Sequence, residues 1–261
     1  MNGETYQLCR LVTEVKMALK EKRDLIYMPE PENFLKIIEF HFMTENTTKA
    51  NMPEVVYDPI VWYEKLREQG LADIKLILPT NVEDFNLLGF SNTNRGSMVT
   101  FLKGGKVRYW IADWKYETEI KKWRVTYKEY EWKDAPDNRP SYADNTTEFV
   151  DVLDRISVFA DKIGYKNFGD IFRESAAIVR GEKEEVLNER QKEIPRPVFP
   201  ITHKPIFAAV AKADVFGAMG SWNDSPEWSA HNMGLIDEYK SLSSELLAQI
   251  RRATMYAVNE W

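Results

Sequence analysis

The chain has 261 residues, of which 44% are hydrophobic and 29% are charged, and its formal net charge is −6 at pH 7. A chain of this length and composition can bury a core of its own, and its negative charge argues against a general affinity for nucleic acid. Cys9 is the single cysteine, so no intrachain disulfide can form, and no apolar run approaches the ~20 residues of a membrane span. We therefore expect a cytoplasmic protein without a membrane segment.

The first part of the chain predicts two helices and several short strands. Apolar residues recur at helical spacing over residues 4–22 and again over 58–70. Residues 35–43 alternate in a way that favours a strand, paired as a hairpin with 24–28, and the apolar run 74–78 predicts another strand.

The clearest pattern lies between residues 97 and 132. Three strand-like runs occur there, and the first two are separated by Gly104 and Gly105. A glycine pair between two alternating runs is a strong hairpin signal. This segment therefore predicts an antiparallel β-meander with the glycine pair at one hairpin tip.

Helical patterns dominate after residue 145. Asn145 and Glu148 have the spacing of a capping box, and the helix that follows presents an apolar stripe of Phe149, Val152, Ile156 and Ile163. Further helices are predicted over 167–180, 205–216 and 235–253. The charged, proline-containing segment 182–204 predicts an exposed linker or loop.

Strands before residue 140 and helices after it predict an α+β fold. In this fold, the meander and the earlier strands pack with N-terminal helices and with a C-terminal helical region. Residues 1–140 would form the sheet-containing region and 141–261 the helical one. The two regions either form one compact domain or fold separately.

One candidate site is the polar, glycine-containing segment between two predicted helices. Glycines allow close approach of the backbone, and a hydroxyl, an indole, an amide and a carboxylate could direct a polar ligand. A serine, an aspartate and a histidine also provide the residue types of a hydrolytic triad. A structural corner with the indole in the core is the favoured alternative. The candidate residues are Gly217, Gly220, Ser221, Trp222, Asn223, Asp224 and His231.

A second candidate is the predicted meander itself. Residues 97–133 contain nine lysines and arginines against five acidic residues. A basic sheet face with aromatic rings suits single-stranded nucleic acid or an acidic peptide, whereas cross-strand ion pairs would make it an ordinary solvated face. The solvated face is the favoured alternative. The candidate residues are Arg108, Trp110, Arg124, Lys128 and Tyr130.

The sequence contains no phosphate-binding loop, zinc-protease or serine-hydrolase motif. Three histidines and one cysteine do not suggest a metal site, and we expect no cofactor. The aromatic residues make up 13% of the chain. We therefore expect a non-catalytic binding protein whose partner is a protein rather than nucleic acid. The alternatives are a hydrolase that uses residues 214–231 and a single-stranded nucleic-acid binder that uses residues 97–133.

Overall fold

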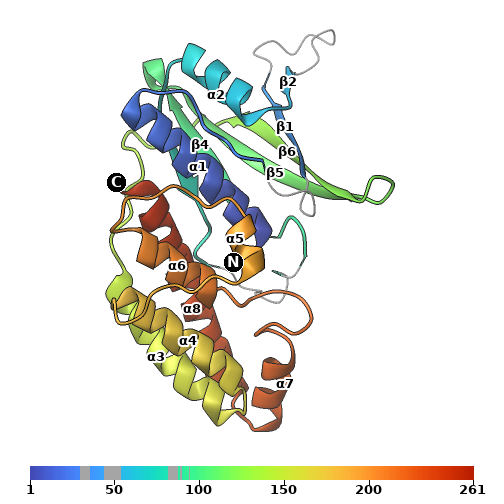
Figure 1. The fold of residues 1–261 in the computed structure, drawn as a ribbon, viewed down its shortest axis with the longest axis vertical. Helices are drawn as coiled ribbons and strands as arrows, with labels where there is room; N and C mark the ends of the chain where they lie inside the picture. The colour runs from blue at the N-terminus through green and yellow to red at the C-terminus, as the bar shows by residue number, and fades with distance from the viewer. Residues whose placement is uncertain (30–35, 44–53, 82–87, 89, 94) are drawn as a thin grey trace.

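The computed structural model describes residues 1–29, 36–43, 54–81, 88, 90–93 and 95–261 (Figure 1). These residues form a mixed α/β structure with eight helices and a six-stranded sheet. The helices are α1 (Gly3–Glu21), α2 (Pro59–Glu68), α3 (Thr146–Lys162), α4 (Lys166–Val179), α5 (Glu189–Glu193), α6 (Lys204–Ala213), α7 (Ser225–Asn232) and α8 (Ile236–Asn259). The strands are β1 (Lys36–His41), β2 (Val55–Val56), β3 (Leu71–Ile77), β4 (Ser97–Leu102), β5 (Val107–Glu117) and β6 (Lys122–Glu131).

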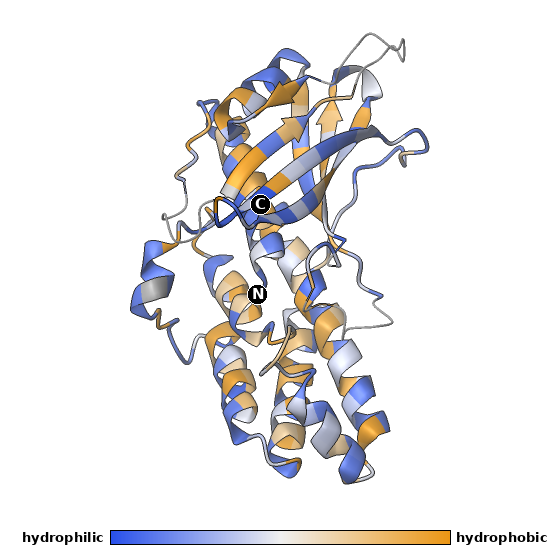
Figure 2. Ribbon diagram, turned by 90° about the vertical axis from the view of Figure 1, so that its right-hand side faces the viewer, coloured by the Kyte–Doolittle hydropathy of each residue, from blue (hydrophilic) through white to orange (hydrophobic). Residues whose placement is uncertain are grey.

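The molecule is elongated, with the sheet at one end and a group of helices at the other (Figure 1). Helices α1 and α2 lie with the sheet, and α3, α4, α6 and α8 form the helical end. Residues along these helices alternate between hydrophobic and hydrophilic (Figure 2), as expected when each helix buries one stripe. No helix among the described residues is long and apolar enough to cross a membrane.

The sheet has the strand order β2-β1-β6-β5-β4-β3. The predicted meander is confirmed, because β4, β5 and β6 pair antiparallel in succession. A 3₁₀ turn at Lys103–Gly105 joins β4 to β5, and Gly104 and Gly105 both have φ of 76°. Only glycine adopts this backbone conformation readily, which explains why the pair stands at the tip.

The sheet is mixed and not purely antiparallel, which corrects the predicted fold. Strand β1 runs parallel to β6, with Ile38 opposite Val125, and antiparallel to β2. Residues 24–28 form no strand, so the expected hairpin with 35–43 is wrong. A parallel pairing joins segments that are far apart in the chain, and the alternation within one strand does not reveal such a partner.

The sheet and α2 share an aromatic core. The ring of Phe40 stacks on Trp62 at 4.5 Å and on Tyr127 at 5.2 Å between centroids, and Trp62 meets Trp110 edge to face at 5.6 Å. All four rings are fully buried. Burial of each ring contributes roughly 1.5–3 kcal/mol, so this cluster fixes α2 against the sheet.

Helix α3 buries the apolar stripe that its sequence predicts. Phe149, Val152, Ile156 and Ile163 are all buried. The predicted capping box is wrong, because the Asn145 side chain makes no capping hydrogen bond to α3. Its amide Nδ2 donates instead to the Gln249 side chain on α8 at 2.7 Å. The polar residue before the helix therefore ties two helices together rather than ending one.

Helix α8 connects the helical end to the sheet. Near its C-terminus the Asn259 amide accepts from the Leu76 N–H and donates to the Leu76 carbonyl, both at 2.8 Å. Leu76 lies on β3, the edge strand, so the amide takes the place of a neighbouring strand. An edge strand exposes unpaired backbone groups, and Asn259 satisfies two of them.

The segment predicted to be an exposed linker, 182–204, is not exposed along its whole length. Pro197, Phe199 and His203 are buried. The Val198 N–H donates to Thr13 Oγ1 on α1 at 3.2 Å. The segment around Val198 therefore packs against α1. A sequence rich in charges and prolines did not indicate that these apolar side chains are buried.

Candidate functional site

The polar segment before α7 forms a loop held by its own side chains. Asn223 Oδ1 accepts from the Gly217 N–H at 2.8 Å and from Ser221 Oγ at 2.9 Å. Its Nδ2 donates to the Gly217 carbonyl at 2.9 Å. The Asp224 carboxylate accepts from the Gly220 N–H at 2.7 Å. These polar groups are engaged with the loop backbone, as in a structural corner.

Trp222 lies in the core of the helical end. It is fully buried, and its Nε1 donates to Ser243 Oγ on α8 at 2.8 Å. The Tyr239 hydroxyl donates to the Trp222 carbonyl at 2.8 Å, and burial raises the pKa of this tyrosine. Because the indole is covered on all sides, it offers no surface to a ligand.

The three residue types of a triad are not arranged as one. Ser221 Oγ donates to Asn223, and the Asp224 carboxylate faces Gly220. His231 is exposed on α7, and within the described chain it makes no hydrogen bond to either of them. The structure therefore gives no geometric support to the hydrolase alternative, which needs a base within hydrogen-bond reach of the nucleophile.

The predicted basic-aromatic face combines residues from both sides of the sheet, and this is a correction. In the register of β5 and β6, Trp110 is opposite Glu129, and Lys128 is opposite Ile111. Opposite residues share a face and successive residues alternate, so Trp110 and Lys128 lie on different faces. Arg108 and Trp110 are on the covered side of the sheet, where both are buried. Arg124, Lys128 and Tyr130 are on the other side. A shift of pairing by one residue moves every side chain to the opposite face.

The open side of β1, β6 and β5 carries a network of ion pairs. Glu39 pairs with Arg124, and its Oε2 lies 3.2 Å from His41 Nε2. Arg124 Nε also donates to Glu117 at 2.6 Å, which holds the pKa of that carboxyl below its usual value. Lys128 lies 3.4 Å from Asp113. Of the cations on this face, Arg124 and Lys128 are thus matched by carboxylates.

The far end of the β5–β6 hairpin carries an exposed aromatic cluster on the other face. The Trp123 ring meets Tyr116 at 5.4 Å and Trp114 at 6.3 Å, both edge to face. Tyr116 and Trp123 are 45% and 36% exposed, and Ile120 in the connecting turn is 47% exposed. We call Trp114, Tyr116, Ile120 and Trp123 the hairpin cluster.

The end of the β5–β6 hairpin, which carries the hairpin cluster, extends beyond the helices that cover the sheet (Figure 1). Alternation along β6 correctly places Trp123 on the same side as Val125 and Tyr127. It does not show that the covering layer ends before Trp123, so alternation alone does not reveal this surface. The number of aromatic residues at the hairpin end was the only signal in the sequence.

A side chain from the loop before β4 braces the hairpin cluster. Asn92 Oδ1 accepts from the Trp114 N–H at 2.7 Å, and Nδ2 donates to the Trp114 carbonyl at 3.0 Å. Ile111 is the last residue of β5 that pairs with β4. The amide therefore supports β5 beyond the end of its neighbouring strand, which keeps the exposed rings on a fixed backbone.

Other candidate chemical groups offer little support for catalysis. Cys9 is fully buried, and burial raises the pKa of its thiol. A thiol in such a setting is a poor nucleophile. The described residues contain no group of three or more histidine, cysteine, aspartate or glutamate side chains placed to hold a metal ion.

No protein-family model, curated protein or solved structure matches the chain.

Proposed function

We propose that the chain is a non-catalytic binding protein that recognises a partner protein through the hairpin cluster. The observation that carries this proposal is the exposed pair Tyr116 and Trp123 at the projecting end of β5 and β6. Tyrosine and tryptophan are enriched among the residues that dominate protein–protein binding energy. Here they lie together on a paired strand backbone, so little conformational entropy is lost when a partner binds.

Charge favours a protein partner over nucleic acid. A nucleic-acid site needs cations that are free to neutralise phosphates. The two cations predicted for this site on the open face, Arg124 and Lys128, are instead paired with Glu39, Glu117 and Asp113. The chain as a whole is also acidic. We therefore expect no binding of a labelled single-stranded oligonucleotide at low salt, the condition that most favours such binding.

An intracellular location is part of the same proposal. A single cysteine that is fully buried suits a reducing compartment. Microscopy of the tagged protein in its own cells tests this point.

Affinity capture with matched variants tests the proposed surface. The double variant Tyr116→Ala/Trp123→Ala removes the exposed rings, and Trp228→Ala removes a ring on α7 that is 71% exposed. We expect a protein that is retained by wild type and Trp228→Ala but lost from the double variant. With that protein purified, calorimetry should show binding at least about tenfold weaker for the double variant.

Two outcomes would contradict the proposal. One is a partner that binds the double variant as tightly as wild type while both remain folded. The other is the absence of any protein that distinguishes the double variant from Trp228→Ala. Thermal melting of each variant verifies that losses do not come from unfolding.

A further inference from the structure

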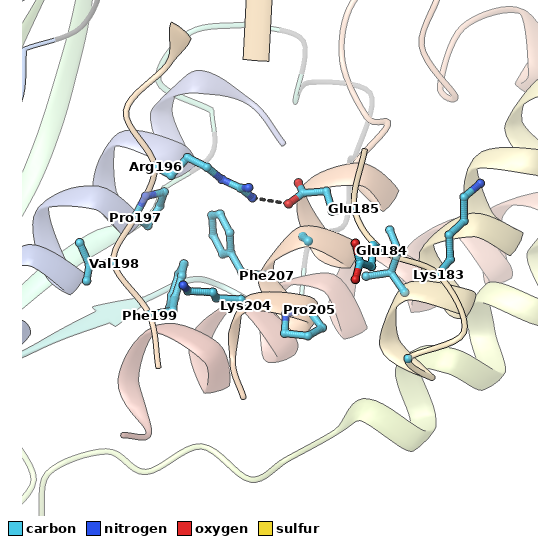
Figure 3. Close-up of a pocket in the computed structure, with 13 residues that line it drawn as sticks. Lys183, Glu184, Glu185, Arg196, Pro197, Val198, Phe199, Lys204, Pro205 and Phe207 are labelled. Carbon is cyan, nitrogen blue, oxygen red and sulfur yellow. Dashed lines mark hydrogen bonds and ion pairs between the residues drawn. The ribbon is translucent and has the colours of Figure 1, made fainter. Parts of the chain in front are cut away.

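A cavity of about 560 Å³ lies between the end of α4, the start of α6 and the segment that joins them. Figure 3 shows its lining residues. This volume falls within the range of about 300–1,000 Å³ that is common for small-molecule sites. None of its lining residues belongs to β5 or β6, which carry the hairpin cluster, and so this inference does not rest on the proposed function.

The floor of the cavity is apolar and built from packed rings. Phe199 and Phe207 lie 4.6 Å apart between ring centroids, and Tyr6 on α1 supports Phe207 at 6.0 Å. Ile178 from α4 and Ala208 from α6 complete the apolar lining, and both are buried. Such a floor fits an aromatic or large aliphatic group.

The rim of the cavity has cations on one side and carboxylates on the other. Arg196 and Lys204 come from the chain on one side, whereas Glu184 and Glu185 come from the opposing segment (Figure 3). Arg196 and Glu185 form an ion pair across the mouth at 2.5 Å. A guanidinium has five N–H donors, so this pair leaves donors for a further acceptor.

Two rim groups are without a protein partner in the described part of the chain. Lys204 makes no ion pair or hydrogen bond through its ammonium group, and the same holds for the Glu184 carboxylate. The neighbouring Lys183 is engaged elsewhere, because it pairs with Glu174 on α4 at 2.7 Å. One free cation and one free anion thus flank the same apolar floor.

We propose that this cavity binds a small zwitterion with an apolar side chain, namely an α-amino acid of aromatic or large aliphatic type. Its carboxylate lies toward Lys204 and Arg196, its ammonium lies toward Glu184, and its side chain rests on Phe199 and Phe207. A molecule with a single charge would leave one charged rim group without an ion-pair partner. Each charge-assisted hydrogen bond that is lost weakens binding by roughly tenfold.

Calorimetry with matched ligands tests the polarity of the site. L-phenylalanine and L-leucine serve as probes, and 3-phenylpropanoate and 2-phenylethylamine each lack one of the two charges. We expect L-phenylalanine or L-leucine to bind. If L-phenylalanine binds, we expect each singly charged analogue to bind at least about tenfold more weakly. If only L-leucine binds, we expect no binding of either analogue.

Surface variants test the residues. Lys204→Gln and Glu184→Gln should each weaken binding of the amino acid by about tenfold. Lys166→Gln is the matched control for the first, because Lys166 is also the first residue of a helix. Glu182→Gln is the control for the second, because it lies in the same segment but does not line the cavity. Ala208→Leu should block binding by filling the floor.

Binding of neither amino acid at millimolar concentration would overturn the proposal. So would an analogue that binds as tightly as the amino acid, or Lys204→Gln and Glu184→Gln variants that bind like their controls. If Ala208→Leu proves unfolded in a thermal melt, the two surface variants still decide the matter, since neither removes a buried contact.

Discussion

Asn223 and Asp224 are neighbours at the corner before α7, but they support the loop to different extents. Asn223 makes three hydrogen bonds that close the loop on Gly217 and Ser221, whereas Asp224 accepts one at an exposed position. We expect Asn223→Ala to lower the free energy of unfolding by about 1–3 kcal/mol. Asp224→Asn should change it by less than about 0.5 kcal/mol.

Urea denaturation of the two variants measures this contrast. Equal losses of stability, or a larger loss for Asp224→Asn, would contradict a corner held by Asn223. The sequence favoured a structural corner here because glycines and an asparagine are typical of one. It could not identify which polar side chain closes the loop, since that depends on the direction of each side chain.

Glu174 on α4 gives a prediction about pH. Ion pairs with Lys183 and Lys212 lower the pKa of Glu174 from 4.5 to about 2. Because the folded state lowers this pKa, the stabilisation is fully present above 4.5 and is lost as the pH falls toward 2. The carboxylate is more than a third exposed, so its contribution is below about 1 kcal/mol.

We therefore expect Glu174→Gln to be slightly less stable than wild type at neutral pH. The difference should shrink as the pH falls from 4.5 toward 2. Urea denaturation at several pH values measures it, with Glu182→Gln as an exposed control. A difference that stays constant across this interval would show that the charge of Glu174 is not responsible.

The alternation of apolar and polar residues predicts where strands lie, but not how they pair. Alternation correctly placed β4, β5 and β6 and the hairpin at Gly104 and Gly105. It did not identify the parallel partner of β1 or the register between β5 and β6. Register depends on the connecting turn, and this turn put Trp110 on the covered side and Lys128 on the open side.

Helix α3 gives a direct test of an assigned face. Ile156 is fully buried and Val158, two residues later, is 68% exposed. Ile156→Asp places an unpaired carboxylate in the core and should destabilise the protein by more than about 4 kcal/mol. Val158→Asp makes the same kind of change on the solvent side and should melt close to wild type. Similar melting temperatures for the two variants would show that the face is misassigned.

The Asn259 side chain on α8 pairs with the edge of β3 at Leu76. Asn259→Ala leaves the N–H and carbonyl groups of Leu76 without their partner, which should cost about 1–3 kcal/mol. Equilibrium denaturation measures the loss. Arg252→Ala, which truncates an exposed side chain on the same helix, serves as the control. Stability equal to that control would mean that water replaces the amide without cost.

At the scale of the whole molecule, the sequence placed strands before residue 140 and helices after 141, in agreement with the structure. Whether the two regions are separate domains stays a prediction. The contacts of α8 favour one cooperative unit. Gln249 on α8 bonds to Asn145 at the start of α3, and Asn259 on α8 bonds to the edge strand of the sheet. These links join residues more than 100 positions apart in the chain, so periodicity could not predict them.

Unfolding followed by two probes tests this cooperativity. Five of the eight tryptophans lie before residue 140, so fluorescence mainly reports the sheet region, whereas circular dichroism reports the helices, most of which lie after residue 141. We expect the two urea transitions to coincide, as in a two-state domain. We also expect Asn259→Ala to shift both of them equally, because the lost contact bridges the regions. Transitions that separate, or a shift confined to fluorescence, would show that the sheet and the helical region unfold independently.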